Sequence, residues 1–238
     1  MTNVVCVKWG DKFSDDYVYR LKNAVERNST RDVNFACYSD KKIPGINTFI
    51  LAEGYEGWWN KLQLFDPRSR IRNGDFRYVY LDLDIVITGN IDWLLDYDGV
   101  LMGNENHGVN NPEEKHRYEY YKNAFMSAVM AWDTYKIPDI WETFCAFSSQ
   151  IIQNFPGDGE FLNELFKQNG FKPDLIQQLY PGKIRSYKYE CYENGLPEET
   201  SLVDFHGKPN PDEAISKIVD SWGTLFYPRE WVAEYWKM

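Results

Sequence analysis

The segment Tyr80-Leu-Asp-Leu-Asp-Ile-Val86 places two carboxylates directly after an apolar run. Residues 77–81 are rich in β-forming types and predict a buried strand that ends at Asp82. Side chains alternate along an extended chain, so Asp82 and Asp84 should point to one side. Ligands of open α/β sheets bind beyond the carboxyl ends of the strands, and paired carboxylates suit Mg²⁺ or Mn²⁺. This segment therefore predicts a metal site at one edge of a sheet.

The sequence around this segment predicts one α/β domain over residues 1–238. Strand, helix and strand follow one another between residues 4 and 38, and this βαβ order implies a parallel sheet flanked by helices. The predicted strands cover 4–8, 33–38, 77–81, 100–103, 124–132 and 202–205. The predicted helices cover 15–28, 58–65, 92–95, 138–153, 160–168, 212–220 and 229–236.

The charge of the chain argues against a nucleic-acid partner. Acidic residues outnumber basic ones by 36 to 26, whereas nucleic-acid binding draws its affinity from Lys and Arg. The four cysteines form no C-x-x-C pair and are expected to be free thiols, which suits a reducing compartment. The chain has no signal-peptide pattern and no apolar stretch of membrane-spanning length, so we expect a cytoplasmic location. The polar run over 104–122 predicts a lid or a binding loop.

Two chemistries use a D-x-D pair after a strand. In one, a metal holds a nucleoside diphosphate leaving group. In the other, Asp82 is the nucleophile of a phosphatase that resembles the haloacid dehalogenases, with Gly157-Asp-Gly as a later acidic motif. That phosphatase pattern normally opens its domain, yet a βαβ unit precedes Asp82 here. A third reading, a non-catalytic carbohydrate-binding module, rests on the aromatic share of 17%.

The late segment His206-Gly-Lys208 favours the diphosphate chemistry. Its histidine can supply a neutral nitrogen to a metal. Its glycine permits close approach of the backbone, and its lysine can neutralise a diphosphate. None of the three has a role in the phosphatase.

Several ordered motifs resemble those of glycosyltransferases of the GT-A fold. The motifs are Lys8-Trp-Gly, Trp58-Trp-Asn-Lys, Tyr80-Leu-Asp-Leu-Asp, Phe125-Met-Ser-Ala-Val-Met-Ala-Trp-Asp, Pro156-Gly-Asp-Gly-Glu-Phe-Leu-Asn and Phe205-His-Gly-Lys-Pro. The likeness is to the glycogenin and lipopolysaccharide galactosyltransferase type and to small relatives in bacteria and large DNA viruses. It spans residues 4–211. It implies a single GT-A, Rossmann-like domain that uses Mn²⁺ or Mg²⁺ to move a sugar. The donor would be UDP- or GDP-linked, and the acceptor a hydroxyl of a glycan, protein or lipid.

The resemblance also implies roles for individual residues. The metal ligands would be Asp82, Asp84 and His206. The contacts to the nucleotide sugar would come from Val7, Lys8, Trp9, Gly10, Tyr17, Lys61, Leu81, Asp82, Leu83, Ser127, Gly207 and Lys208. The catalytic candidates are Asp158 and Glu160, with an N-cap of the following helix as the alternative role of Asp158.

Two positions depart from the family pattern. Met126 and Gly159 stand where the family usually has Asn and Gln. A donor contact is therefore lost or moved, and the residue proposed to stabilise the sugar cation in retaining members is replaced. Retention and inversion at the anomeric carbon both stay open.

Overall fold

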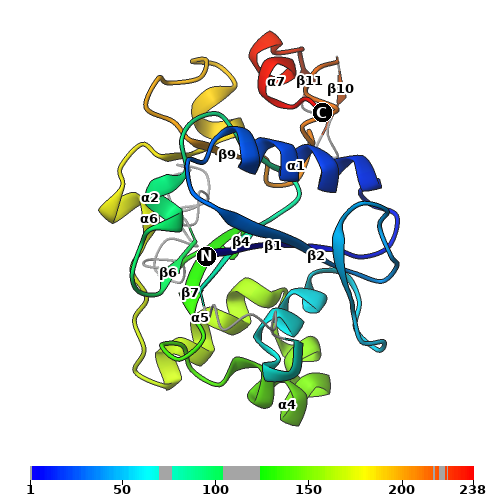
Figure 1. The fold of residues 1–238 in the computed structure, drawn as a ribbon, viewed down its shortest axis with the longest axis vertical. Coiled ribbons are helices and arrows are strands. Elements are labelled where there is room, and N and C mark those ends of the chain that lie inside the picture. The colour runs from blue at the N-terminus through cyan, green and yellow to red at the C-terminus, as the bar shows by residue number, and fades with distance from the viewer. Residues whose placement is uncertain (1, 70–76, 104–123, 217, 220–222, 224) are drawn as a thin grey trace.

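A six-stranded sheet forms the centre of the molecule (Figure 1). The computed structural model describes residues 2–69, 77–103, 124–216, 218–219, 223 and 225–238. The strand order is β3-β2-β1-β4-β7-β6, which are Asn47–Ile50, Val33–Ser39, Thr2–Lys8, Arg77–Leu81, Val129–Asp133 and Leu101–Met102. Strands β3, β2, β1 and β4 run parallel, and β7 is antiparallel to β4 and β6. The predicted α/β class with a mainly parallel sheet is confirmed.

The βαβ unit at the start of the chain sets the parallel part of the sheet. Helix α1 (Asp15–Arg27) joins β1 to β2, and these strands pair from Thr2 opposite Val33 to Lys8 opposite Ser39. Strand β4 lies on the other side of β1, where it pairs in parallel. The carboxyl ends of β1 and β4 therefore meet at one edge, and the acidic pair follows the end of β4.

Helices cover both faces of the sheet. One core combines Val4 and Cys6 of β1 with α1 and α7 (Glu230–Tyr235). The other combines Val5 of β1 with α4 (Ile140–Asn154) and α5 (Asp158–Gln168). Alternation of side chains along a strand explains this division. In Figure 1, α1 lies above the sheet and α4 and α5 lie below it.

A three-stranded sheet begins directly after the acidic pair. Its strands are β5 (Ile85–Ile87), β9 (Leu202–Asp204) and β8 (Ile184–Ser186), in the order β5-β9-β8. Antiparallel pairing of β5 with β9 sets Ile85 opposite Asp204. The sequence predicted β9, whereas β5 and β8, which are equally short, were missed. This pairing brings a late segment of the chain beside the acidic pair.

Shorter helical elements connect these layers. They are the 3₁₀ helices η1 (Gly57–Phe65) and η2 (Pro67–Ser69), the helices α2 (Asp92–Leu95) and α6 (Ile176–Leu179), and the π-helical turn η5 (Tyr187–Cys191). The helices predicted over 15–28, 58–65, 92–95, 138–153, 160–168 and 229–236 are confirmed, with η1 as a 3₁₀ rather than an α-helix.

Two predicted elements are wrong in type or extent. The described residues of the helix predicted over 212–220 are not helical, because residues 211–216 make turns and bends and β10 (Ile218–Val219) pairs with β11 (Leu225–Phe226). Strand pairing decides the conformation here against the helical spacing of the sequence. The strand predicted over 124–132 is shorter, since β7 begins at Val129. The polar run over 104–122 lies outside the described residues.

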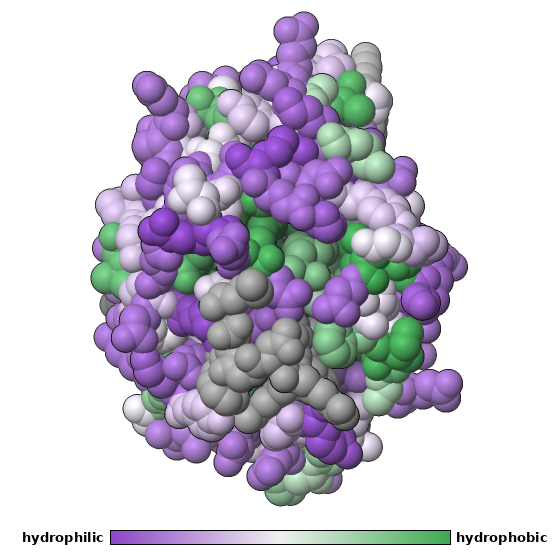
Figure 2. Space-filling view, in the orientation of Figure 1, coloured by the Kyte–Doolittle hydropathy of each residue, from purple (hydrophilic) through white to green (hydrophobic). Residues whose placement is uncertain are grey.

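The face of the molecule in Figure 2 is mainly hydrophilic, and the four cysteines are free thiols. Figure 2 shows a face on which hydrophilic residues predominate and apolar residues form smaller groups. Cys6, Cys37 and Cys191 are buried free thiols, and Cys145 is an exposed one. Of the helices that the structure describes, none has both the length and the apolar character needed to cross a membrane.

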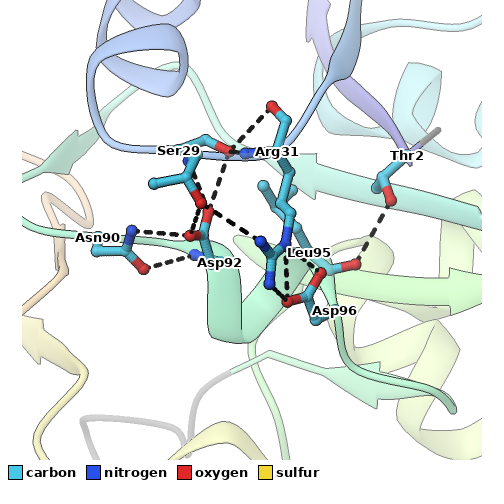
Figure 3. A network of polar contacts seen from close by, with 8 residues as sticks. Thr2, Ser29, Arg31, Asn90, Asp92, Leu95 and Asp96 are labelled. Atoms are coloured by element: carbon cyan, nitrogen blue, oxygen red, sulfur yellow. Dashed lines mark hydrogen bonds and ion pairs between the residues drawn. The ribbon is translucent and has the colours of Figure 1, made fainter.

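A network of hydrogen bonds connects the turn after α1 to the start of α2 (Figure 3). Asp92 accepts hydrogen bonds from Thr30 Oγ1 at 2.6 Å, from the Thr30 amide at 2.9 Å and from Ser29 Oγ at 3.2 Å. The side-chain amide of Asn90 donates to it at 3.1 Å. The Thr30 hydroxyl, with these other donors, holds the pKa of the Asp92 carboxyl well below its usual range.

We expect Asp92→Ala to lower the free energy of unfolding at pH 7 by about 2 kcal/mol, because it removes several charge-assisted hydrogen bonds. Folding lowers the pKa of Asp92, so its contribution is present above about pH 4 and is lost as the pH falls further. Urea unfolding at pH 7 and pH 3 measures both values. Asp96→Ala removes an exposed partner of Arg31 and should cost less. An equal loss for Asp92→Ala at the two pH values would contradict this account.

Candidate active site

A cleft of about 440 Å³ opens at the carboxyl ends of β1 and β4. Its lining residues come from segments that are far apart in the sequence. They are Val7, Trp9, Asp11, Lys12 and Phe13 around the end of β1, Gly57, Trp58 and Lys61 of η1, Tyr80, Asp82, Leu83 and Asp84 at the end of β4, Met126, Ser127 and Ala128 before β7, and Asp158 of α5. Asp82 and Asp84 therefore face the same cleft.

A buried lysine connects two of the acidic residues in this cleft. Lys61 is 5% exposed, and its Nζ lies 3.4 Å from Asp82 Oδ1 and 3.3 Å from Asp158 Oδ2. The ammonium also donates to Ser127 Oγ at 3.0 Å and to the Ser127 carbonyl at 3.3 Å. The Tyr80 ring lies 5.0 Å from Nζ, and the Tyr80 hydroxyl donates to Asp82. One cation thus bridges the acidic pair and the start of α5.

The charges of this cluster stabilise one another. Burial alone would lower the pKa of the Lys61 ammonium, but the carboxylates of Asp158 and Asp82 raise it to about 12. Burial raises the pKa of Asp82 despite the opposing effects of Lys61 and Tyr80. Lys61 is therefore a cation at neutral pH, and it cannot release a proton to a substrate there.

Asp84 lies near two further carboxylates. Burial raises the pKa of the Asp84 carboxyl, the charges of Asp82 and Asp204 raise it further, and it reaches about 8 although Lys12 acts in the opposite direction. Asp204 is 2% exposed and belongs to β9, opposite Ile85. A divalent cation between such carboxylates would relieve their repulsion. The excess negative charge beside Asp84 is therefore one that a hard divalent ion would offset.

Asp158 is one of the residues that line the cleft. It begins α5 and accepts a hydrogen bond from Ser127 Oγ at 2.6 Å. Gly157 occupies the N-cap position, so Asp158 does not cap this helix. A Cβ on Gly159 would lie 3.7 Å from Ser127 Oγ, which places a side chain at this position beside the cleft wall. The glycine leaves that space open.

The backbone before β7 is held close to β6. A Cβ on Gly103 would lie 1.6 Å from the Met126 carbonyl oxygen, and the φ of Gly103 is +47°. Only glycine permits this approach. Gly103 therefore allows the backbone of Met126, which lines the cleft together with Ser127, to pack directly against the end of β6.

The predicted segment around His206 does not line the cleft. His206 Nε2 lies 2.6 Å from Ser186 Oγ, and its ring centre is 5.3 Å from that of Tyr189. In the described parts of the chain, no group of three or more His, Cys, Asp or Glu side chains is arranged to hold a metal ion. The structure therefore brings Asp82 and Asp84 together without His206, and the three-ligand site stays a prediction.

The glycine and lysine after His206 form an exposed turn. Lys208 is about half exposed and makes an ion pair with Glu213. Gly207 has a φ of +78°, and a Cβ there would lie 3.4 Å from Lys188 Nζ. Lys188 thus approaches the backbone of the segment that was predicted to contact a diphosphate, and the sequence had not indicated it.

The residues near β1 and β4 that the resemblance implied as contacts to the nucleotide sugar divide into two groups. Val7 and Trp9 line the cleft. Lys8 is 2% exposed, and its ammonium donates to the Gly10 carbonyl at 3.1 Å and lies 3.4 Å from Asp15. The predicted contacts Lys8, Gly10, Tyr17 and Leu81 do not line the cleft, and neither does the catalytic candidate Glu160. The Tyr17 hydroxyl donates to Asp212 instead.

Sequence reasoning missed several residues of the cleft. Asp204 and Lys12 influence the pKa of Asp84, and Trp58 and Phe13 line the cleft. Lys12 and Phe13 follow a recognised strand end, so their position in the chain was a usable signal. No local pattern indicated Asp204, because its place depends on the pairing of β5 with β9.

Known proteins resemble this chain in structure. No family model and no curated protein matches the sequence. The galactosyltransferase LgtC, solved with donor and acceptor sugar analogues, matches at 13% identity and a TM-score of 0.60, over 88% of this chain and 89% of LgtC. The glycosyltransferase GlyE of Streptococcus pneumoniae matches at 14% identity and a TM-score of 0.63, over all of this chain and 60% of GlyE.

A third match covers a smaller share of its protein. The bifunctional glycosyltransferase WbbM matches at 11% identity and a TM-score of 0.55, over 88% of this chain and 46% of WbbM. At such identities the matches show the fold. The chain has the GT-A glycosyltransferase fold, as its motifs indicated.

Proposed function

We propose that the protein is a metal-dependent glycosyltransferase. It would move a sugar from a UDP- or GDP-linked donor to a hydroxyl of a glycan, protein or lipid. The observation that carries the proposal is the acidic pair Asp82 and Asp84, which opens into the cleft beside Lys61 and Asp158. The GT-A fold supports it, because the cleft lies where open α/β sheets bind their ligands.

The metal would be Mn²⁺ or Mg²⁺, held by Asp82 and Asp84. The raised pKa of Asp84 supports this, since a cation beside Asp82 and Asp84 would offset the repulsion that contributes to it. His206 is the proposed third ligand. Its hydrogen bond to Ser186 is the kind that orients a metal-binding histidine, which would then face the ion with its other ring nitrogen.

Transfer breaks the bond between the anomeric carbon and a phosphate oxygen, through a state that resembles an oxocarbenium ion. A bound divalent ion supplies Lewis-acid stabilisation of the negative charge that builds on the leaving diphosphate. Lys208 and Lys12 are the proposed cationic side chains for the same charge. Trp9 and Val7 would contact the nucleoside, and Lys61 and Ser127 would hold the end of the cleft that takes the sugar.

Asp158 is the preferred carboxylate at the reacting carbon. Lys61 and Ser127 fix its position, whereas Glu160 lies outside the cleft lining. In an inverting reaction Asp158 would accept the proton of the acceptor hydroxyl, and in a retaining reaction it would hold a hydroxyl of the donor sugar. NMR of the product's anomeric proton distinguishes the two outcomes.

A thermal-shift screen tests the function. UDP and GDP should raise the melting temperature when Mn²⁺ is present and lose this effect when a chelator is added, because a ligand of the folded state stabilises it. Hydrolysis of an aryl phosphate with Mg²⁺ but no nucleotide binding would point to the phosphatase. Carbohydrate binding that chelators leave intact, again without nucleotide binding, would point to the sugar-binding module.

The phosphatase is not favoured. Its nucleophile would be Asp82, which instead accepts a hydrogen bond from Tyr80 and pairs with Lys61. The GT-A fold also places this residue after β4, behind a complete βαβ unit.

A further inference from the structure

Two consecutive tryptophans of η1 have different environments. Trp59 is 7% exposed and stacks on Phe144, with ring centres 5.9 Å apart and planes 10° apart. Trp58 is 56% exposed and lines the cleft. Among the residues that the structure describes, no aromatic ring packs against Trp58. Trp59 is therefore a core residue, whereas packing in the core does not explain a tryptophan at position 58.

The geometry of η1 ties Trp58 to Lys61. Side chains three residues apart in a 3₁₀ helix share one face, so Trp58 and Lys61 point the same way. One such turn advances by about 6 Å, roughly the width of a pyranose ring. Lys61 holds Asp158, so the indole lies one helical turn along η1 from the lysine that positions the carboxylate proposed to act at the reacting carbon.

A carboxylate lies beside the indole. Glu160 Oε2 and Trp58 Nε1 lie 3.1 Å and 3.5 Å from the position that a Cβ on Gly157 would take. The absence of a side chain at Gly157 leaves room for both groups. Among the described residues, the Glu160 carboxylate has no hydrogen-bond or ion-pair partner. An apolar ring that lines the cleft and an acceptor-only carboxylate therefore lie on either side of Gly157.

We propose that Trp58 and Glu160 form a subsite for a pyranose ring of the acceptor, which makes the acceptor a carbohydrate. The inference rests on the proposed glycosyl transfer. The C–H face of the sugar packs on the indole, and two of its hydroxyls donate to Glu160. A further hydroxyl then points toward Asp158, where the donor sugar is transferred.

The charges around Trp58 select a neutral ligand. Glu160 and Asp158 disfavour a phosphate or another anion at this end of the cleft. Trp9 and Phe13, around the end of β1, also line the cleft, and Lys12 Nζ lies 4.5 Å from the centre of the Phe13 ring. These two rings offer a nucleobase an aromatic face of its own beside a cation. A pyranose ring offers both an apolar face and hydroxyl donors, and this combination matches the two side chains.

Sugar binding can be measured without knowledge of the donor. The probes are the methyl glycosides of galactose, glucose, mannose and N-acetylglucosamine, added to the ¹⁵N-labelled full chain. Trp58→Phe assigns the Trp58 indole N–H signal by its loss and keeps part of the stacking face. Phe147→Ala is the matched control, because Phe147 is 55% exposed but lies outside the cleft lining.

At least one glycoside should shift the Trp58 indole signal in the wild type. Trp58→Ala should weaken the binding of that glycoside about ten-fold, as expected for the loss of one stacking face. Glu160→Gln should also weaken it, and Phe147→Ala should leave it unchanged. Because Trp58 is exposed, its variants should keep the melting temperature of the wild type.

Two results would overturn the subsite. One is that no glycoside moves the Trp58 signal. The other is that UDP or GDP with Mn²⁺ moves it and Trp58→Ala weakens nucleotide binding, which would make Trp58 a nucleobase platform. A failure of both nucleotides to bind the wild type is a separate result, because it contradicts glycosyl transfer and leaves the glycoside titration as it stands.

Discussion

Asp84→Asn is expected to abolish the Mn²⁺-dependent binding of UDP or GDP while the protein stays folded. The amide side chain retains one oxygen but loses the charge that a hard divalent ion requires. Loss of a direct ligand should exceed the roughly 10–100-fold cost of removing an outer-shell partner. Isothermal titration with the nucleotide, with and without Mn²⁺, measures the effect. Asp16→Asn removes an equal charge from the exposed side of α1 and should bind as the wild type does.

In the absence of metal, Asp84→Asn should be more stable than the wild type. Folding raises the pKa of Asp84 to about 8, so the metal-free wild type loses stability as the pH rises from about 4 to 8. The amide of Asp84→Asn does not titrate, and urea unfolding at pH 5 and pH 8 should therefore differ less in the variant. Nucleotide affinity equal to that of the wild type in the presence of Mn²⁺ would refute the role of Asp84.

Lys61→Met should destabilise the fold by about 3–5 kcal/mol, because it leaves the buried Asp158 and the half-buried Asp82 without their cation. The contribution of Lys61 is present below about pH 10 and is lost as the pH rises through 12, since folding raises its pKa. Urea unfolding at pH 7 measures the change. Transfer activity should also fall, because Lys61 positions Asp158.

A double variant separates the lost charge pair from lost packing. Lys61→Met with Asp158→Asn removes both charges and should recover part of the stability that Lys61→Met loses. Lys136→Met breaks an exposed pair with Asp98 and should change stability little. If the double variant is no more stable than Lys61→Met, the ion pair with Asp158 does not carry the effect.

The local signals of the sequence were sufficient for the sheet and the acidic pair. The apolar run before Asp82 predicted β4 with its observed bounds, and the helix predicted over 15–28 matches α1 to within one residue. These elements are long or strongly patterned, so neighbouring residues alone determine them. The helix predicted over 212–220 failed because the pairing of β10 with β11 overrides its spacing.

Local sequence patterns did not predict all residues of the site or all of their contacts. Asp204 reaches the acidic pair through the pairing of β5 with β9, and Lys61 reaches Asp158 through the packing of η1 against α5. The family resemblance implied Lys8 as a contact to the nucleotide sugar, yet its ammonium bonds to the Gly10 carbonyl and pairs with Asp15. Such outcomes depend on contacts between segments far apart in the chain.

Metal-dependent glycosyl transfer is tested most directly by the identity of the product formed from a nucleotide sugar. The full chain is incubated with UDP- and GDP-linked hexoses, Mn²⁺ and a mixture of methyl glycosides, and the phosphorus products are followed by ³¹P NMR. We expect release of a nucleoside diphosphate, which stops on addition of a chelator and in Asp84→Asn. Donors that stay intact, or that are cleaved to a nucleoside monophosphate or to inorganic phosphate, would contradict it.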